Sequence, residues 1–252
     1  TQGVSSAASD VYKRQVQQGK GGVGKSMTAV VFTQYLQSKG AKVLCADTDP
    51  VNRTFSRYKA LDVAAIDIAE GGNVMQRKFD PLMEIILSTD ADVVVDSGAA
   101  TFLPLTRYLA ENDIYQIMAD HGKTVFIHCV LVGGQARSDT YDGLADLLGK
   151  VGKSAKVVIW ENEFWGKVEF DGVPITASKL YKEADKAGKI AGVVKIIDRS
   201  QSDTFTGDIK QMTQANLTLA EVIDSPDFSF LAKNRLKKFV GDVFAELDKI
   251  NW

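Results

Sequence analysis

The sequence predicts an α/β fold, a single three-layer domain in which helices flank a mostly parallel central sheet. The first observation behind this prediction is that short apolar runs alternate along the chain with longer segments of helical periodicity. Such alternation is typical of a parallel sheet, because each strand is followed by a crossover helix. The second is a glycine-rich octapeptide directly before the first helical segment. The 252 residues suffice for one large domain, and no linker-like stretch divides them.

The expected elements follow one another in a regular order. The first helix is expected at residues 26–39, where apolar residues share one side and Gly40 supplies the stop. The apolar run at 42–46 ends at Asp47 and predicts a strand buried on both faces. Further strands are expected at residues 92–96, 114–118, 125–132, 156–160 and 190–197. Further helices are expected at residues 74–87, 102–110, 135–148 and 179–187, and more helices close the chain.

The octapeptide at 19–26 fits the phosphate-binding pattern G-x-x-x-x-G-K-[ST]. Its glycines permit the close backbone approach that a loop around a polyphosphate needs, and its N–H groups can point at phosphate oxygens. Lys25 would neutralise charge on the β- and γ-phosphates, and Ser26 would offer its hydroxyl to Mg²⁺. The alternative is a glycine-rich turn that matches by accident. The residues expected to bind the nucleotide are Gly19, Lys20, Gly21, Gly22, Val23, Gly24, Lys25, Ser26 and Met27.

The segment before this loop is anomalous. Residues 1–15 are small and polar, lack an initiating Met and show little strand pattern. A phosphate loop normally follows a buried apolar strand, and here only Val16 stands close before it. We therefore expect residues 1–15 to be a non-native segment that pairs weakly or is disordered, and the phosphate-binding domain to comprise residues 16–252.

Three aspartates fall at the carboxyl ends of expected strands, the edge of a parallel sheet at which ligands bind. Asp47 and Asp49 follow the strand at 42–46, and Asp96 ends the strand at 92–96. Mg²⁺ prefers carboxylate, hydroxyl and phosphate oxygens. Asp96 has the form of a Walker B residue, which holds the metal directly or through a water, so Ser26 and Asp96 are the expected metal ligands. Each aspartate taken alone could equally be a helix cap or a turn residue.

With these residues placed, the chain resembles the ParA/MinD family of P-loop ATPases. The loop at 20–26 with its second lysine, the segment Asp47-Thr-Asp-Pro50 and Asp96 underlie this resemblance. Segments at 47–61, 133–136 and 160–166 are similar to a branch of the family that serves plasmid conjugation. The resemblance implies a P-loop NTPase fold and a cytoplasmic, Mg²⁺-dependent switch ATPase. Such a protein dimerises around ATP, hydrolyses it slowly and acts with a conjugation-system protein.

The resemblance also implies roles for single residues. Lys20 would reach across an ATP-bound dimer to the partner's phosphates, where a cation acts like an arginine finger; otherwise it is a solvated surface lysine. Asp47 would orient the attacking water, so that the implied catalytic residues are Lys20, Lys25 and Asp47. Asp49 would lie in the switch region that senses the γ-phosphate. Asn162 would read the adenine, since a carboxamide both donates and accepts, or would be a turn residue.

Charge and periodicity limit the other partners. The net charge of −2 gives no global attraction to nucleic acid or to anionic lipid. An apolar stripe at 231–250 begins with a basic cluster that could touch a membrane or DNA phosphates, but the acidic residues Asp242, Glu246 and Asp248 follow it. An ordinary helix packed on the sheet is therefore favoured. Cys45 and Cys129 lie in apolar runs and indicate reduced core residues of a cytoplasmic protein.

Two questions stay open at this level. The aromatic residues Trp160, Phe164, Trp165 and Phe170 form either a partner-binding surface or a flap packed over the base. The second function that the sequence allows is a nucleotide-binding scaffold without significant turnover, which recruits conjugation or partition partners. A small-molecule kinase or amide ligase on the same fold is a third.

Overall fold

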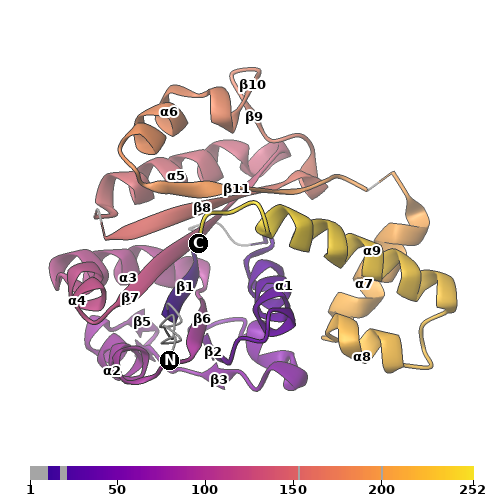
Figure 1. Cartoon of the computed structure of the whole chain (residues 1–252), viewed down its shortest axis with the longest axis horizontal. Coiled ribbons are helices and arrows are strands. Elements are labelled where there is room, and N and C mark those ends of the chain that lie inside the picture. Colours follow the sequence, from indigo (N-terminus) through magenta and orange to yellow (C-terminus); the bar gives the residue numbers. More distant parts are fainter. Residues whose placement is uncertain (1–10, 18–21, 153, 200) are drawn as a thin grey trace, which may run out of the picture.

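A seven-stranded parallel sheet forms the centre of the protein, in the order β11-β8-β7-β1-β6-β2-β3 (Figure 1). The structure is a computed structural model that describes residues 11–17, 22–152, 154–199 and 201–252. The strands of the sheet are β1 (Val11–Gln17), β2 (Val43–Asp47), β3 (Ala64–Ala65), β6 (Asp92–Asp96), β7 (Lys123–Val132), β8 (Ala155–Asn162) and β11 (Ile190–Ile196). Two small antiparallel hairpins pair β4 (Ala69–Glu70) with β5 (Asn73–Val74) and β9 (Glu169–Phe170) with β10 (Val173–Pro174).

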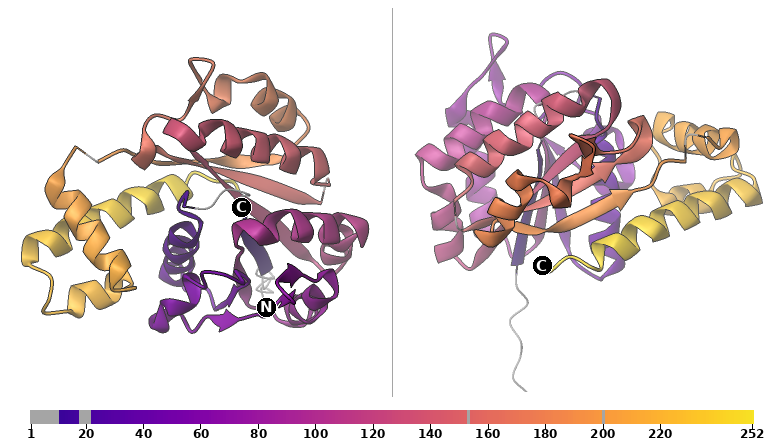
Figure 2. Two further views of the ribbon diagram at one scale, coloured as in Figure 1. Left: turned by 180° about the vertical axis from the view of Figure 1, so that it is seen from behind. Right: turned by 90° about the horizontal axis from the view of Figure 1, so that it is seen from above.

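Helices cover both faces of this sheet and confirm the expected three-layer α/β fold. One face is covered by α2 to α6 and the other by α1 and α9 (Figures 1 and 2). The helices are α1 (Lys25–Ser38), α2 (Asp80–Ser88), α3 (Ala99–Glu111), α4 (Ile114–Asp120), α5 (Arg137–Lys150), α6 (Lys179–Lys186), α7 (Asp203–Gln214), α8 (Leu219–Asp224) and α9 (Phe230–Leu247). Short 3₁₀ turns are η1 (Phe55–Arg57), η2 (Lys59–Leu61), η3 (Gln76–Phe79), η4 (Gly134–Ala136), η5 (Glu163–Trp165) and η6 (Ile175–Ala177).

Two of the expected elements are wrong. The strand expected at 114–118 is the helix α4, in which Ile114, Tyr115 and Met118 are buried while the two residues between them are exposed. That spacing follows a helical turn, whereas a strand would bury alternate residues. The helix expected from residue 74 begins only at Asp80, because β5 and η3 precede it and Pro81 occupies the first helical turn.

The segment before the phosphate loop also differs from expectation. Residues 11–15 were expected to pair weakly or to be disordered, yet β1 lies in the middle of the sheet. It pairs with β7 along Val11–Gln17 and with β6 along residues 13–16. Strand pairing uses backbone N–H and C=O groups, so a segment without an apolar pattern can still occupy a central position. Residues 1–10 lie outside the described residues, and the non-native origin of residues 1–15 stays a prediction.

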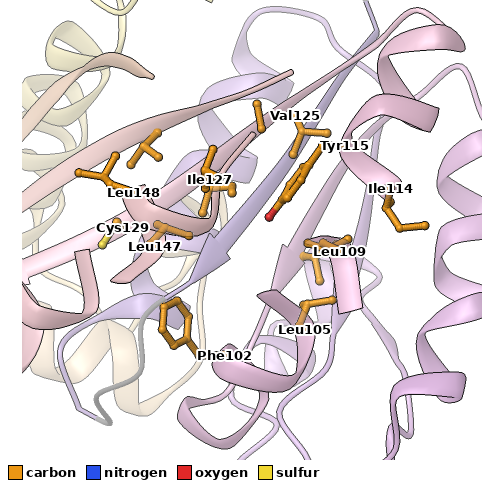
Figure 3. Packing of buried hydrophobic residues seen from close by; sticks show 14 of the residues in the cluster. Phe102, Leu105, Leu109, Ile114, Tyr115, Val125, Ile127, Cys129, Leu147 and Leu148 are labelled. Carbon is orange, nitrogen blue, oxygen red and sulfur yellow. The ribbon is translucent and has the colours of Figure 1, made fainter. Parts of the chain in front are cut away.

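The core consists of apolar layers on the two faces of the sheet. Figure 3 shows side chains from α3, α4, β7 and α5 that meet on the face covered by α2 to α6, among them Phe102, Ile127 and Leu147. Successive residues of β7 point to opposite faces, so Ile127 belongs to this layer and Phe126 to the layer under α1 and α9. Both faces of the strand are therefore buried, which explains its unbroken apolar sequence.

Three helices at the end of the chain extend beyond the sheet. The helices α7, α8 and the start of α9 share a small apolar cluster of their own, and α9 then returns to the sheet (Figures 1 and 2). The apolar stripe of α9 is buried at Leu236, Val240, Val243 and Leu247, which agrees with an ordinary packed helix. None of the described helices is both long enough and apolar enough to cross a bilayer.

Candidate functional site

The described part of the phosphate loop leads directly into α1. Gly22 and Gly24 have φ angles of +74° and +103°, a conformation that side chains with a Cβ rarely adopt, which explains these two glycines. Gly24 is the N-cap of α1, so the first helical turn begins at the loop, where its N–H groups can bind phosphate oxygens. Gly19, Lys20 and Gly21 lie outside the described residues, and their expected roles stay predictions.

The lysine, the serine and the strand-end aspartates gather at the start of α1. Burial lowers the pKa of the Lys25 ammonium, although the carboxylates of Asp96 and Asp49 oppose the shift. Burial likewise raises the pKa of Asp96 to about 7, which the hydrogen bond from Ser26 opposes and the nearby charge of Asp47 reinforces. A buried ammonium beside carboxylates, at the edge of a parallel sheet where ligands bind, is typical of a site that binds a charged ligand.

The pair Ser26 and Asp96 fits a magnesium ion. The Ser26 hydroxyl donates to the Asp96 carboxylate, so that the two oxygens lie within hydrogen-bonding reach of each other. Within the described residues, nothing donates a hydrogen bond to the buried Oδ1 of Asp96. A buried carboxylate oxygen of this kind needs a partner, and a divalent cation with hard oxygen ligands would supply one.

Asp47 anchors the segment that follows β2. Its side chain is buried at the end of the strand, in register with Asp96 on β6. Its Oδ1 accepts a hydrogen bond from the N–H of Asp49 at 3.0 Å, and its Oδ2 accepts one from the N–H of Ser56 at 2.9 Å. The carboxylate therefore ties residues 48–56 to the sheet. The predicted orientation of the attacking water by Asp47 stays a prediction.

Two contacts that the sequence analysis missed, those of Thr48 and Gly98, connect this segment to the Walker B strand. Thr48 donates both its N–H and its hydroxyl to the carbonyl of Asp96. Asp49 accepts from two backbone N–H groups of its own turn, and its carboxylate lies against Gly98. A Cβ on Gly98 would lie 2.5 Å from the Asp49 Cγ, so this position admits only glycine without rearrangement. These contacts join separate strands, and local sequence patterns do not reveal them.

Asn162 lies at the end of β8 and holds the phosphate loop. Its Nδ2 donates to the carbonyl of Val23 at 3.0 Å, and its Oδ1 accepts from the N–H of Phe164 at 3.2 Å. A Cβ on Gly24 would lie 2.9 Å from the same Nδ2. The carboxamide thus organises both the loop and the turn after β8, while the predicted reading of adenine stays a prediction.

Two cavities flank the described part of the loop. One has a volume of about 330 Å³ and is lined on the loop side by Gly22, Gly24, Met27 and Asn162. The other has a volume of about 380 Å³ and lies between the loop and residues 132–136. Trp165 lines both of them. Cavities of this size are suited to parts of a small ligand, and both adjoin the place where the loop would hold phosphate groups.

A glycine-rich loop that opens a helix, with a buried lysine and a half-buried serine beside two strand-end aspartates, defines a P-loop nucleotide-binding protein. The comparisons with known proteins agree. The family model described as the CobQ/CobB/MinD/ParA nucleotide binding domain matches residues 15–237, and the chain belongs to this family. The resemblance to ParA/MinD proteins inferred from the sequence is therefore confirmed.

Individual relatives cover most of the chain. Two curated proteins of Escherichia coli, both named protein TraL, are 39% identical to it over 233 residues, which are 92% of this chain and 95% of each relative. The solved MinD cell division protein of Aquifex aeolicus has a TM-score of 0.49 and 14% identity, covering 96% of this chain and 99% of its own. A plasmid partition protein of Borrelia burgdorferi bound to AMPPNP has a TM-score of 0.48 and 14% identity, covering 95% and 99%.

Proposed function

We propose that the protein is a Mg²⁺-dependent ATPase that acts as a switch in plasmid conjugation, dimerising around ATP and hydrolysing it slowly. The observation that supports this most is the convergence of Lys25, Ser26 and Asp96 at the end of the phosphate loop. Membership of the MinD/ParA family supports the ATPase class. Similarity to the two TraL proteins supports a setting in plasmid transfer and a conjugation-system partner.

Each residue of the site has a distinct task in this proposal. Lys25 lies at the first residue of α1, where its ammonium neutralises charge on the β- and γ-phosphates. Ser26 and Asp96 would hold Mg²⁺, which supplies charge neutralisation on the same phosphate oxygens. Lys20 would complete the site of a second copy, and a cation delivered there raises the rate of phosphoryl transfer by about 10³–10⁵.

The segment at residues 48–61 is the proposed switch. It follows Asp47, which lies next to Asp96 in the sheet, and its Phe55 and Leu61 are buried against the layer that contains α1. A shift of Asp49 or Ser56 would therefore move a packed segment and not only a loop. In this way a change in the bound nucleotide would alter the conformation of residues 48–61 at the surface of the protein.

One observation favours a second function, a nucleotide-binding scaffold with negligible turnover. Both oxygens of Asp47 are already engaged by backbone N–H groups. A carboxylate used in this way has less capacity to orient a water molecule. In this alternative the protein holds ATP and recruits its partners without hydrolysing it.

Phosphate release measured against protein concentration separates the two functions, with ATP binding and light scattering measured on the same samples. We expect turnover to rise more than linearly with protein and ATP to convert monomers into dimers. Lys25→Ala should abolish turnover and ATP-dependent dimerisation, and Lys20→Ala should lower turnover by about 10³-fold or more. Lys182→Ala, an exposed lysine on α6, is the matched control and should change neither.

The contrary outcomes are equally distinct. ATP binding without turnover in the unaltered protein supports the scaffold and refutes the switch. Turnover strictly proportional to protein concentration, with Lys20→Ala fully active, refutes a site completed by a second copy. A protein that binds no ATP refutes both functions.

A further inference from the structure

Two segments far apart in the sequence meet beside the phosphate loop. Gly133 and Gly134 follow β7, and η5 with Gly166 follows β8. A Cβ on Gly133 would lie 2.4 Å from the carbonyl oxygen of Gly166, and a Cβ on Gly134 would lie 2.8 Å from that of Trp165. Gly134 also has a φ of +65°. The two glycines therefore allow the backbone of η5 to approach, and this approach holds Trp165 next to the loop.

The aromatic residues of this region divide into two groups. Trp160 is buried and donates its indole N–H to Nδ1 of His128 at 2.9 Å, and Phe170 packs on Tyr141. Phe164 and Trp165 instead remain 38% and 54% exposed. Their rings contact each other edge to face, with centroids 4.8 Å apart and planes at 87°. Phe164 therefore supports the indole of Trp165 from the side and leaves aromatic surface open to a ligand.

Both rings line the 330 Å³ cavity, whose position suits a nucleobase. Lys25 and Asp96 mark the end of the site for the terminal phosphate, and Asp96 belongs to β6. The cavity lies at the ends of β8 and β11, and the sheet order places these strands on the opposite side of β1 from β6 (Figure 1). A nucleotide whose triphosphate follows the loop towards Asp96 has its base on that opposite side.

The far wall of the cavity is mostly apolar. It is made by Ile196 at the end of β11, Ile197 after it, Phe205 and Ile209 of α7 and Phe239 of α9, with Arg199 and Thr213 as its polar members. A flat heteroaromatic base fits between this mostly apolar wall and the aromatic pair Phe164 and Trp165, because both of its faces are then removed from water.

We propose that Trp165, supported by Phe164, stacks on the base of the bound nucleotide. This inference rests on the proposed function, because it takes the nucleotide to lie on the phosphate loop. Loss of one aromatic ring from a stacked base weakens binding by about 10- to 100-fold. In this arrangement the ring contacts the base and not the phosphates, so phosphate binding should not depend on it.

The test compares ATP with inorganic triphosphate as ligands of the full chain. Trp165→Ala should bind ATP about 10- to 100-fold more weakly and triphosphate within twofold of the unaltered protein. Trp165→Phe should keep most of the ATP affinity, and Gly133→Ala should lose it in the same selective way. ATP, but not triphosphate, should quench tryptophan emission, and Trp165→Ala should remove the quench. Phe230→Ala, an 81% exposed aromatic residue of α9, is the matched control and should change no affinity.

The outcomes separate this inference from the function on which it rests. Trp165→Ala that binds ATP as the unaltered protein does overturns the stacking; if its ATP-dependent dimer is then lost, Trp165 contacts a second copy instead. Equal losses for ATP and triphosphate overturn it too, because they indicate a disturbed loop. An unaltered protein that binds neither ligand overturns the proposed function and the stacking together. Lys25→Ala, which should lose both ligands, tests the loop alone.

Discussion

The attachment of the segment after β2 can be tested at Asp47. Its side chain is 1% exposed, and its two oxygens accept the N–H groups of Asp49 and Ser56. In Asp47→Asn one oxygen becomes an NH₂ group, which cannot accept, so one partly buried backbone N–H is left without a partner. Such a loss costs about 1–3 kcal/mol, and we expect the free energy of unfolding to fall by about 2 kcal/mol.

Hydrogen exchange measures the same effect locally, and urea unfolding measures it globally. Since each 1.4 kcal/mol is a factor of ten, the protection of the Asp49 or the Ser56 amide should fall roughly 30-fold. Asp49→Asn is the matched control, because the hydrogen bonds of Asp49 lie in an exposed turn and should be worth about 0.5 kcal/mol. Unchanged exchange at both amides, or equal destabilisation by the two variants, would refute the anchoring role.

Two further predictions concern the core and a buried carboxylate. Leu147→Ala removes a fully buried side chain shown in Figure 3 and should lower the free energy of unfolding by about 2–5 kcal/mol. Leu103, on α3, is 55% exposed, and Leu103→Ala should change this free energy by only about 0.5 kcal/mol. Similar losses in the two variants would contradict the packing. Burial raises the pKa of Glu161, although Lys195 at 3.2 Å opposes the shift. The folded state then binds the proton more tightly than the unfolded chain, so this residue's contribution to stability falls as pH rises between the two pKa values. Glu161→Gln should therefore gain stability over the unaltered protein at about pH 7 and lose that gain at about pH 4; a gain confined to low pH would contradict the shift.

Local patterns identified most of the elements and the chemistry of the site. The apolar runs that end in Asp47 and Asp96 were sufficient to place both aspartates at one edge of the sheet, because parallel strands end at the same side. The same reasoning was wrong where the pattern was short or absent. The five residues at 114–118 are too few to distinguish the periodicity of a helix from that of a strand. The pairing of β1 uses its backbone, so an apolar sequence pattern does not predict it.

The sequence by itself determined the class of the protein, because a phosphate loop is a continuous segment whose glycines, lysine and serine each have a local function. Only the tertiary structure decided how that loop is held. Asn162 reaches Val23 across 139 positions of sequence, and Gly133 admits the turn that carries Trp165. Such contacts depend on which strands become neighbours in the sheet, and strand order is a property of the whole chain that no local periodicity specifies.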